Sequence, residues 1–169
     1  MRYAVMLRVV VMMLVFPCAM TAQTARRTAR PSADGAAAVI RAVFAAAERG
    51  DLAALDTLYA GDSLTVFESA GINRGWTDYR DHHLGPELKR MTGFKYRPID
   101  VIARVDGRLA WATVSYALQA KEDNRVIDNF GRGTFILEQV GAAGTTRWVV
   151  RHSHTASRAR RPNDPPMPE

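Results

Sequence analysis

The sequence has 169 residues, with 23 lysines and arginines against 17 aspartates and glutamates, which gives a net charge of +6. This excess lies at the two ends, because residues 34–157 contain 15 basic and 15 acidic residues. A nucleic-acid-binding domain needs a basic patch within the fold, so the neutral centre argues against that class. The single cysteine, Cys18, excludes an internal disulfide and a metal site built from several cysteines.

The first 25 residues have the layout of a secretory signal peptide. Arg2 and Arg8 flank the start of an apolar run over residues 9–16, and small and polar residues follow it. The run is shorter than the roughly 20 apolar residues of a transmembrane helix. We therefore predict a periplasmic or secreted protein that has no stable membrane span after cleavage.

The composition divides the chain into four parts. We predict a signal peptide at residues 1–25, a linker at 26–34, one domain at 35–157 and a basic, proline-rich tail at 158–169. The tail is predicted to be disordered because it offers almost no apolar side chains for packing. The central segment has the usual size of a single domain.

Apolar spacing predicts helices in the first part of the domain. Between residues 35 and 49 the apolar side chains recur at the spacing of one helical face. Gly50 is expected to end this helix, and Asp51 is expected to cap a second one. A third helix is predicted over residues 76–84, followed by a helical turn that begins at Pro86.

The remaining segments have the pattern of β-strands. One strand is predicted at residues 63–69, and four more are predicted at 94–105, 109–121, 126–138 and 146–156. The Asp-Gly pair at 106–107 and two other short separators predict consecutive hairpins, and therefore an antiparallel meander. Helices followed by a meander indicate an α+β fold, with the helices covering one face of a curved sheet.

The last predicted strand ends in the run WVVRHSHT at residues 148–155. Because side chains alternate along a strand, Trp148, Val150, His152 and His154 are expected on one face, as a core stripe that continues into a polar pocket. Two histidines at this spacing also occur in metal sites. With His83 or Glu68 they would complete a ligand set for zinc, copper or iron.

Four local motifs and the order of the elements resemble the nuclear transport factor 2-like, or SnoaL-like, superfamily. The motifs are AAERGDLAALDTLYA at 46–60, VFESAG at 66–71, YRDHHL at 79–84 and WVVRHSHTASR at 148–158. The resemblance covers almost all of residues 36–157 and extends to secreted bacterial members. It implies a cone-shaped curved antiparallel sheet, helices on its concave face, a pocket at the open end, and a homodimer.

Three further residues are candidates for the pocket. Glu68 ends an apolar strand and, if it points inward, is a desolvated carboxylate suited to acid–base chemistry; otherwise it is exposed or paired with an arginine. Tyr79 and His83 are four residues apart on one helical face, where they can orient a ligand or simply hydrogen-bond to each other. Trp111 lies on a strand and is expected in the core or in the pocket wall.

We therefore expect an exported domain that binds a small organic molecule in a pocket lined by histidine, glutamate and tyrosine. Glu68, His83, His152 and His154 are the candidate catalytic residues for a proton transfer of the isomerase, cyclase or lyase type. Tyr79 and Trp111 are the candidate ligand-binding residues, and no cofactor, metal or nucleic acid is expected. Two alternatives stay open: a non-catalytic binding or assembly module, and a small histidine-rich metal-binding protein.

Overall fold

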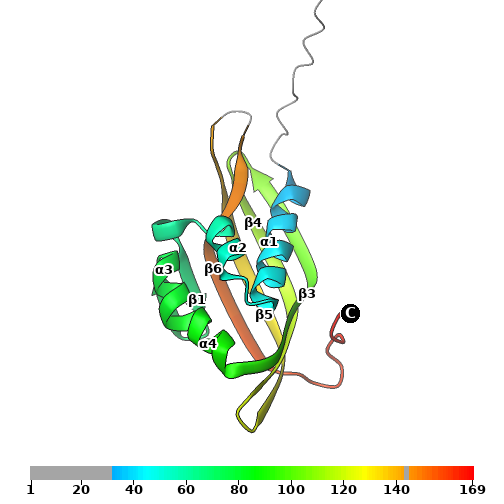
Figure 1. Cartoon of the computed structure of the whole chain (residues 1–169). Coiled ribbons are helices and arrows are strands. Elements are labelled where there is room, and N and C mark those ends of the chain that lie inside the picture. The colour runs from blue at the N-terminus through cyan, green and yellow to red at the C-terminus, as the bar shows by residue number, and fades with distance from the viewer. Residues whose placement is uncertain (1–31, 143–144) are drawn as a thin grey trace, which may run out of the picture.

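The computed structural model describes residues 32–142 and 145–169. The predicted signal peptide and Cys18 lie outside these residues. Within them, six strands form one curved mixed sheet, and the helices lie on one of its faces (Figure 1). The predicted α+β architecture is therefore confirmed.

The elements follow the predicted order closely. The helical segments are α1 (Ala33–Glu48), α2 (Leu52–Leu58), a short 3₁₀ turn η1 (Gly61–Ser63), α3 (Trp76–Tyr79), a π-helical turn η2 (Arg80–Leu84) and α4 (Gly85–Arg90). The strands are β1 (Thr65–Glu68), β2 (Gly71–Arg74), β3 (Met91–Asp106), β4 (Leu109–Glu122), β5 (Arg125–Val140) and β6 (Arg147–Ala159). None of the helices in this described part is long and apolar enough to cross a membrane.

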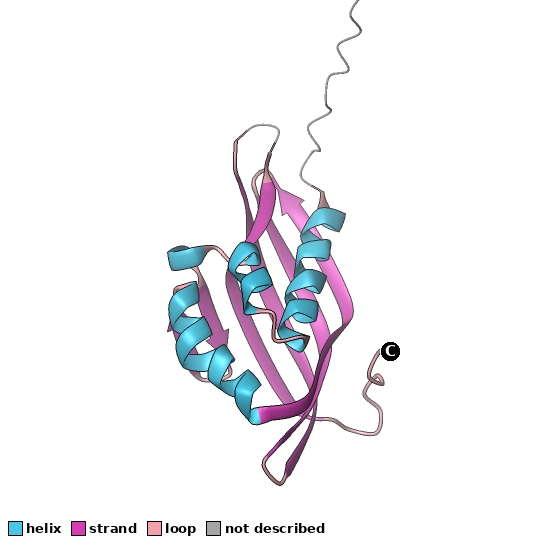
Figure 2. Ribbon diagram, in the orientation of Figure 1, coloured by secondary structure: helices cyan, strands magenta, loops and turns pink. Residues whose placement is uncertain are grey.

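The sheet has the strand order β2-β1-β6-β5-β4-β3. Strands β3 to β6 form the predicted antiparallel meander, whose long hairpins are visible in Figure 2. The prediction of a wholly antiparallel sheet is wrong in one place, because β1 pairs with β6 in parallel. This pairing joins residues 87 positions apart, such as Thr65 and His152, and local sequence patterns carry no signal for it.

Local capping chemistry sets the boundaries of the first two helices. The Ser32 hydroxyl accepts a hydrogen bond from the Gly35 amide (3.0 Å) at the start of α1. After α1, Gly50 adopts a φ of 65°, a left-handed conformation that costs glycine little. The Asp51 carboxylate then accepts from the Ala54 amide (2.9 Å) and caps α2, as predicted.

Helix α1 supplies the centre of the core. Ile40 and Phe44 are fully buried against the sheet. The Phe44 ring stacks on Tyr96 of β3, with ring centroids 4.2 Å apart. Helices α3 and α4 with η2 lie beside β1 at the other side of the same sheet face (Figure 1).

Strand β6 contains a bulge that changes which side chains face the helices. Val150 pairs with Leu137, whereas His152 pairs with the adjacent residue Ile136, so Arg151 is an extra residue in β6. An extra residue reverses the alternation of the side chains that follow it. The prediction that His152 and His154 share the face of Val150 is therefore wrong.

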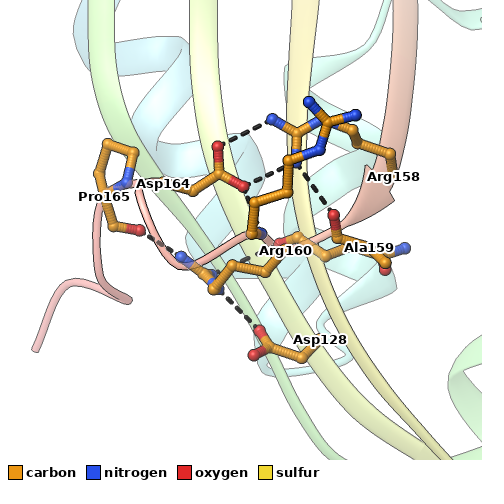
Figure 3. Close-up of polar contacts among 8 residues, drawn as sticks. Asp128, Arg158, Ala159, Arg160, Asp164 and Pro165 are labelled. Carbon is orange, nitrogen blue, oxygen red and sulfur yellow. Dashed lines mark hydrogen bonds and ion pairs between the residues drawn. The ribbon is translucent and has the colours of Figure 1, made fainter.

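The C-terminal residues fold back along the meander (Figure 3). The Asp164 carboxylate accepts two hydrogen bonds from the Arg158 guanidinium, at 2.6 and 2.8 Å. Arg160 donates to Asp128 of β5 at 2.9 Å, and Arg97 of β3 donates to the Pro168 carbonyl at 2.8 Å. The sequence predicted a disordered tail from residue 158, whereas the structure gives this segment specific polar contacts.

Candidate functional site

A partly enclosed cavity of about 150 Å³ lies between the helices and the sheet. Most of its lining is apolar or aromatic and comes from α1, α4 and β3 to β5. The polar groups that line it come from Tyr59, Glu68, Tyr79, Glu87, Tyr96, Asn129, Ser153 and Thr155. An apolar cavity with a few convergent polar groups is the usual form of a small-molecule site.

A larger depression of about 420 Å³ lies on the opposite, outer face of the sheet. It is shallow and open to solvent, and His154, Arg132 and Asp100 are among its lining residues. Because it does not enclose a ligand, we place the candidate site in the smaller cavity.

Glu68 points into the cavity from the end of β1. Val66, two residues earlier on the same face, is buried in the core. The Tyr79 hydroxyl donates a hydrogen bond to Oε2 of Glu68 at 3.2 Å. Of the orientations that the sequence left open for Glu68, the structure therefore has the inward one.

His83 reaches the same carboxylate from the turn η2. Its Nε2 atom lies 3.7 Å from Oε2 of Glu68 and 3.4 Å from Oε1 of Glu87. The Tyr79 ring packs edge-on against the His83 ring, with centroids 5.3 Å apart, while the Tyr79 hydroxyl bonds to Glu68. The predicted proximity of Tyr79 and His83 is confirmed, and His82, predicted on the opposite face, is 75% exposed.

Asn73 of β2 holds the other nitrogen of His83. The Nδ1 atom of His83 lies 2.8 Å from Oδ1 of Asn73. The amide nitrogen of Asn73 donates to Oδ2 of Asp78 at 3.0 Å, which fixes the amide with its oxygen toward His83. The hydrogen-bond network therefore assigns a proton to Nδ1, and Nε2 faces the two carboxylates.

Asp78 is fixed in turn by several donors. Asn73 and the Arg74 amide both donate to Oδ2 of Asp78, and His82 lies 3.2 Å from its other oxygen. The hydrogen bond from Asn73, followed by that from Arg74, holds the pKa of the Asp78 carboxyl below its ordinary value. Asp78 thus stays ionised and continues to orient Asn73.

His83 lies in a π-helical turn, η2, directly before α4, which carries Glu87. The Gly85 amide donates to the Arg80 carbonyl, five residues earlier. A Cβ atom at Gly85 would lie 2.6 Å from that carbonyl oxygen, so the turn needs glycine here. Pro86 disfavours a regular α-helix through this point because its ring meets the carbonyl four residues before it. π-helical turns are frequent at functional sites.

Glu87 is the site residue that the sequence analysis missed. It lies on α4, four residues after His83, and this i,i+4 spacing is the only local signal that could have identified it. Burial raises the pKa of the Glu87 carboxyl above its ordinary value, and the nearby charge of Glu68 raises it further. Two carboxylates thus share a partly desolvated space.

The tyrosines around this cluster remain protonated donors. Burial raises the pKa of Tyr59 and Tyr79 well above the ordinary value, and the charge of Glu68 adds to both shifts. The three side chains Glu68, His83 and Glu87 place one ligand atom each within 4.8 Å of one another. Within the described residues, this trio is therefore the donor set best suited to a divalent cation.

The remaining predicted site residues lie on the outer face of the sheet. His152 Nδ1 is 3.0 Å from the Thr65 hydroxyl, and the rings of His152 and His154 both contact Phe67. Trp111 is 43% exposed on the face opposite the buried Ala110 and Ala112. Their predicted place in one pocket with Glu68 and His83, including the metal set built on the two histidines, is wrong.

Ser153 and Thr155 take the place in the cavity that was predicted for the two histidines. Both are buried and line the cavity, because the bulge at Arg151 turns them toward the helices. The cavity therefore has two hydroxyl groups where two ionisable imidazoles were predicted.

The family model for the SnoaL-like domain matches residues 36–158. A nuclear transport factor 2 (NTF2-like) superfamily protein from Salmonella enterica serovar Typhimurium is similar in structure, with a TM-score of 0.67 and 15% identity, over 75% of this chain and 91% of its own. A protein with a cystatin-like fold from Caulobacter vibrioides has a TM-score of 0.63 and 20% identity, over 77% of this chain and 90% of its own.

A ketosteroid isomerase-like protein from Erwinia carotovora atroseptica has a TM-score of 0.64 and 13% identity, over 78% of this chain and 99% of its own. At these identities the similarity establishes the fold. The comparison with curated proteins gave no match. The resemblance deduced from the sequence is confirmed by the family match and by these structures.

Proposed function

Because the chain belongs to the SnoaL-like domain family, we propose that its cavity binds a small organic molecule and that Glu68 and His83 transfer a proton there. The observation that carries this proposal is the contact geometry at one end of the cavity. Glu68 Oε2 is within 3.2 Å of the Tyr79 hydroxyl and 3.7 Å of His83 Nε2. A carboxylate and an imidazole side by side can accept a proton from a ligand and return it to another atom.

Each member of the cluster has a separate role in this proposal. Glu68 accepts the proton, because its carboxylate lines the cavity and lies next to both the Tyr79 hydroxyl and His83. Tyr79 orients Glu68 through its hydrogen bond. His83 takes that proton from Glu68 at Nε2, which lies 3.7 Å from Oε2 of Glu68, and returns it to the ligand at a second position. Reactions of the isomerase, cyclase or lyase type need this pair of steps.

A deuterium-exchange assay tests proton transfer even when the product is not identified. A panel of single-ring ketones is incubated with the protein in D₂O, and loss of the α-proton signal is followed by ¹H NMR. We expect exchange above the buffer rate for at least one compound, a fall of about 100-fold in Glu68→Gln, and a similar loss in His83→Ala.

His82→Ala is the matched control, because His82 is the neighbouring histidine and points to solvent. It is expected to retain the wild-type exchange rate. Compounds that bind in the cavity and exchange no faster than in buffer would support a non-catalytic binding module instead. Equal exchange by wild type and Glu68→Gln would refute the assigned base.

Export and dimerisation extend this proposal. We infer that the protein is exported, since its first 25 residues have the layout of a signal peptide. N-terminal sequencing of periplasmic or secreted material is expected to begin between about residues 20 and 26. Recovery of Met1 in the cytosolic fraction alone would contradict export.

We also infer a homodimer formed through the outer sheet face. Exposed Trp111 and Ile136 are register neighbours there, and His152 pairs with Ile136 on the next strand. A contiguous apolar patch on a sheet is a common protein contact surface. Light scattering is expected to give twice the monomer mass, and Trp111→Arg is expected to halve it. A monomeric wild type would contradict this assignment.

A further inference from the structure

The charge of the cavity lining points to the chemical class of the ligand. Glu68 and Glu87 both line the cavity, and in the described part of the chain no lysine or arginine lines it. We propose that the cavity binds a small organic cation, an amine on a single apolar ring, with its ammonium group at the two carboxylates. The inference rests on the proposed binding function and assigns a ligand class to the same cavity.

The two carboxylates are close enough to share one ammonium group. Their oxygens and His83 Nε2 lie within 4.8 Å of one another, and an ammonium nitrogen placed between two oxygens at this separation is within hydrogen-bond distance of both. A primary ammonium has three N–H donors, so it can donate to both carboxylates at once. The nearest arginine on α4, Arg90, is bonded to Glu122 at 3.1 Å.

The two carboxylates repel each other. Burial raises the pKa of the Glu87 carboxyl and the charge of Glu68 raises it further, while the charges of His83 and Arg90 lower it. A bound ammonium group would offset the repulsion between the two carboxylates. An anionic ligand would instead add a third negative charge to the same desolvated space.

Tyr59 places a further polar group in the cavity. It is 7% exposed and lines the cavity. The Tyr59 ring is held in place by Trp76, which stacks on it with centroids 4.9 Å apart. Its hydroxyl is therefore a fixed donor for a polar group of a ligand.

The aromatic lining fits the rest of such a ligand. Tyr79, Phe94, Tyr96 and Phe135 line the cavity together with Tyr59. Aromatic faces attract cations as well as apolar rings. A cavity of about 150 Å³ has the volume that holds one benzene-sized ring.

Three probes of nearly equal size and different charge test this inference: benzylamine, benzyl alcohol and benzoate. Binding to the purified protein is measured by calorimetry at neutral pH with EDTA present, and location is checked by NMR shifts of Tyr79. We expect benzylamine to bind about tenfold more tightly than benzyl alcohol, since charge-assisted hydrogen bonds are about twice as strong as neutral ones. Benzoate is expected not to bind.

Glu87→Gln is the diagnostic variant, and Glu138→Gln is its matched control. Glu138 is a half-buried glutamate on β5 that bonds to Arg151 and does not line the cavity. Glu87→Gln is expected to remove the tenfold preference for benzylamine and to leave benzyl alcohol binding unchanged. Glu138→Gln is expected to bind all three probes as the wild type does, and circular dichroism confirms that both variants are folded.

Each other outcome overturns the inference in a recognisable way. Equal binding of benzylamine and benzyl alcohol at Tyr79 would leave the small-molecule cavity standing and reject the cation class. Tighter binding of benzoate than of benzylamine would also reject the cation class. Binding of Zn²⁺ without EDTA, together with no binding of benzylamine, would assign the carboxylates to a metal. Absence of any probe from the cavity would reject this inference, while the deuterium-exchange assay would still report on proton transfer.

Discussion

His83 and Asn73 are joined by a hydrogen bond of 2.8 Å between the imidazole Nδ1 and the amide oxygen. Asn73 itself is held by Asp78, at 3.0 Å. The chain from Asp78 through Asn73 to His83 therefore fixes which imidazole nitrogen faces Glu68 and Glu87. Asn73 and Asp78 do not contact the carboxylate of Glu68 or Glu87. They are therefore positioning residues, which act on the cluster through His83.

Replacement of Asn73 by alanine is expected to release the His83 ring. Without the acceptor at Nδ1, both neutral tautomers become populated, and ¹⁵N NMR of the imidazole should show a mixture in place of one form. Proton exchange should fall several-fold. The cost in stability is expected to be about 0.5–1.5 kcal/mol, the usual net value of one hydrogen bond. An unchanged tautomer in Asn73→Ala would contradict the positioning role.

Glu87→Gln is expected to stabilise the fold at neutral pH. The pKa of Glu87 is raised in the folded protein. Its favourable contribution to the free energy of unfolding is therefore present below the ordinary pKa of 4.5 and is lost as pH rises through the folded pKa. Glutamine stays neutral at every pH, so the melting temperature of the variant should exceed that of wild type at pH 7. The difference should vanish near about pH 3.5, where both side chains are neutral. A lower melting temperature of the variant at pH 7 would contradict this prediction. Residues that bind a ligand often lower the stability of the free protein.

The two terminal histidines are expected to be dispensable for ligand binding. His152→Ala and His154→Ala remove side chains on the outer sheet face, so affinity for a cavity ligand should change less than about twofold. His152→Ala should cost about 0.5–1.5 kcal/mol, because Thr65 loses its hydrogen-bond partner. Calorimetry and thermal melts measure both effects. Loss of cavity binding in His154→Ala would contradict the position of the bulge at Arg151.

Deletion of residues 160–169 is expected to lower the melting temperature. The deletion removes the contacts of Arg160 with Asp128 and of Asp164 with Arg158 that Figure 3 shows. A melt of the truncated protein that matches the wild type would show that the tail adds nothing to stability.

Asp164→Asn is a milder form of the same test. The Arg158 guanidinium holds the pKa of the Asp164 carboxyl below its ordinary value of 3.8. The contribution of this ion pair to the free energy of unfolding is therefore present above pH 3.8 and is lost as pH falls further. The variant should melt lower than wild type at neutral pH and converge with it in strong acid. Glu169→Gln, at the exposed end of the tail, is the control and should melt like the wild type.

Local chemistry in the sequence determined the helices, the meander and part of the site. Helix α1 follows its apolar spacing, and Asp51 caps α2 as its residue type predicts. The inward face shared by Tyr79 and His83 also follows from spacing, because residues four apart on a helical face are neighbours whatever surrounds them. Each of these features depends on interactions within one or two turns of chain.

Only the tertiary structure decided which residues complete the cavity. A bulge at Arg151 exchanges His152 and His154 for Ser153 and Thr155, and strict alternation along β6 gives no sign of it. Asn73 joins His83 through the short strand β2, which the sequence pattern did not predict. Local patterns report short-range energies, whereas sheet register and the pairing of β1 with β6 are set by the packing of the whole domain.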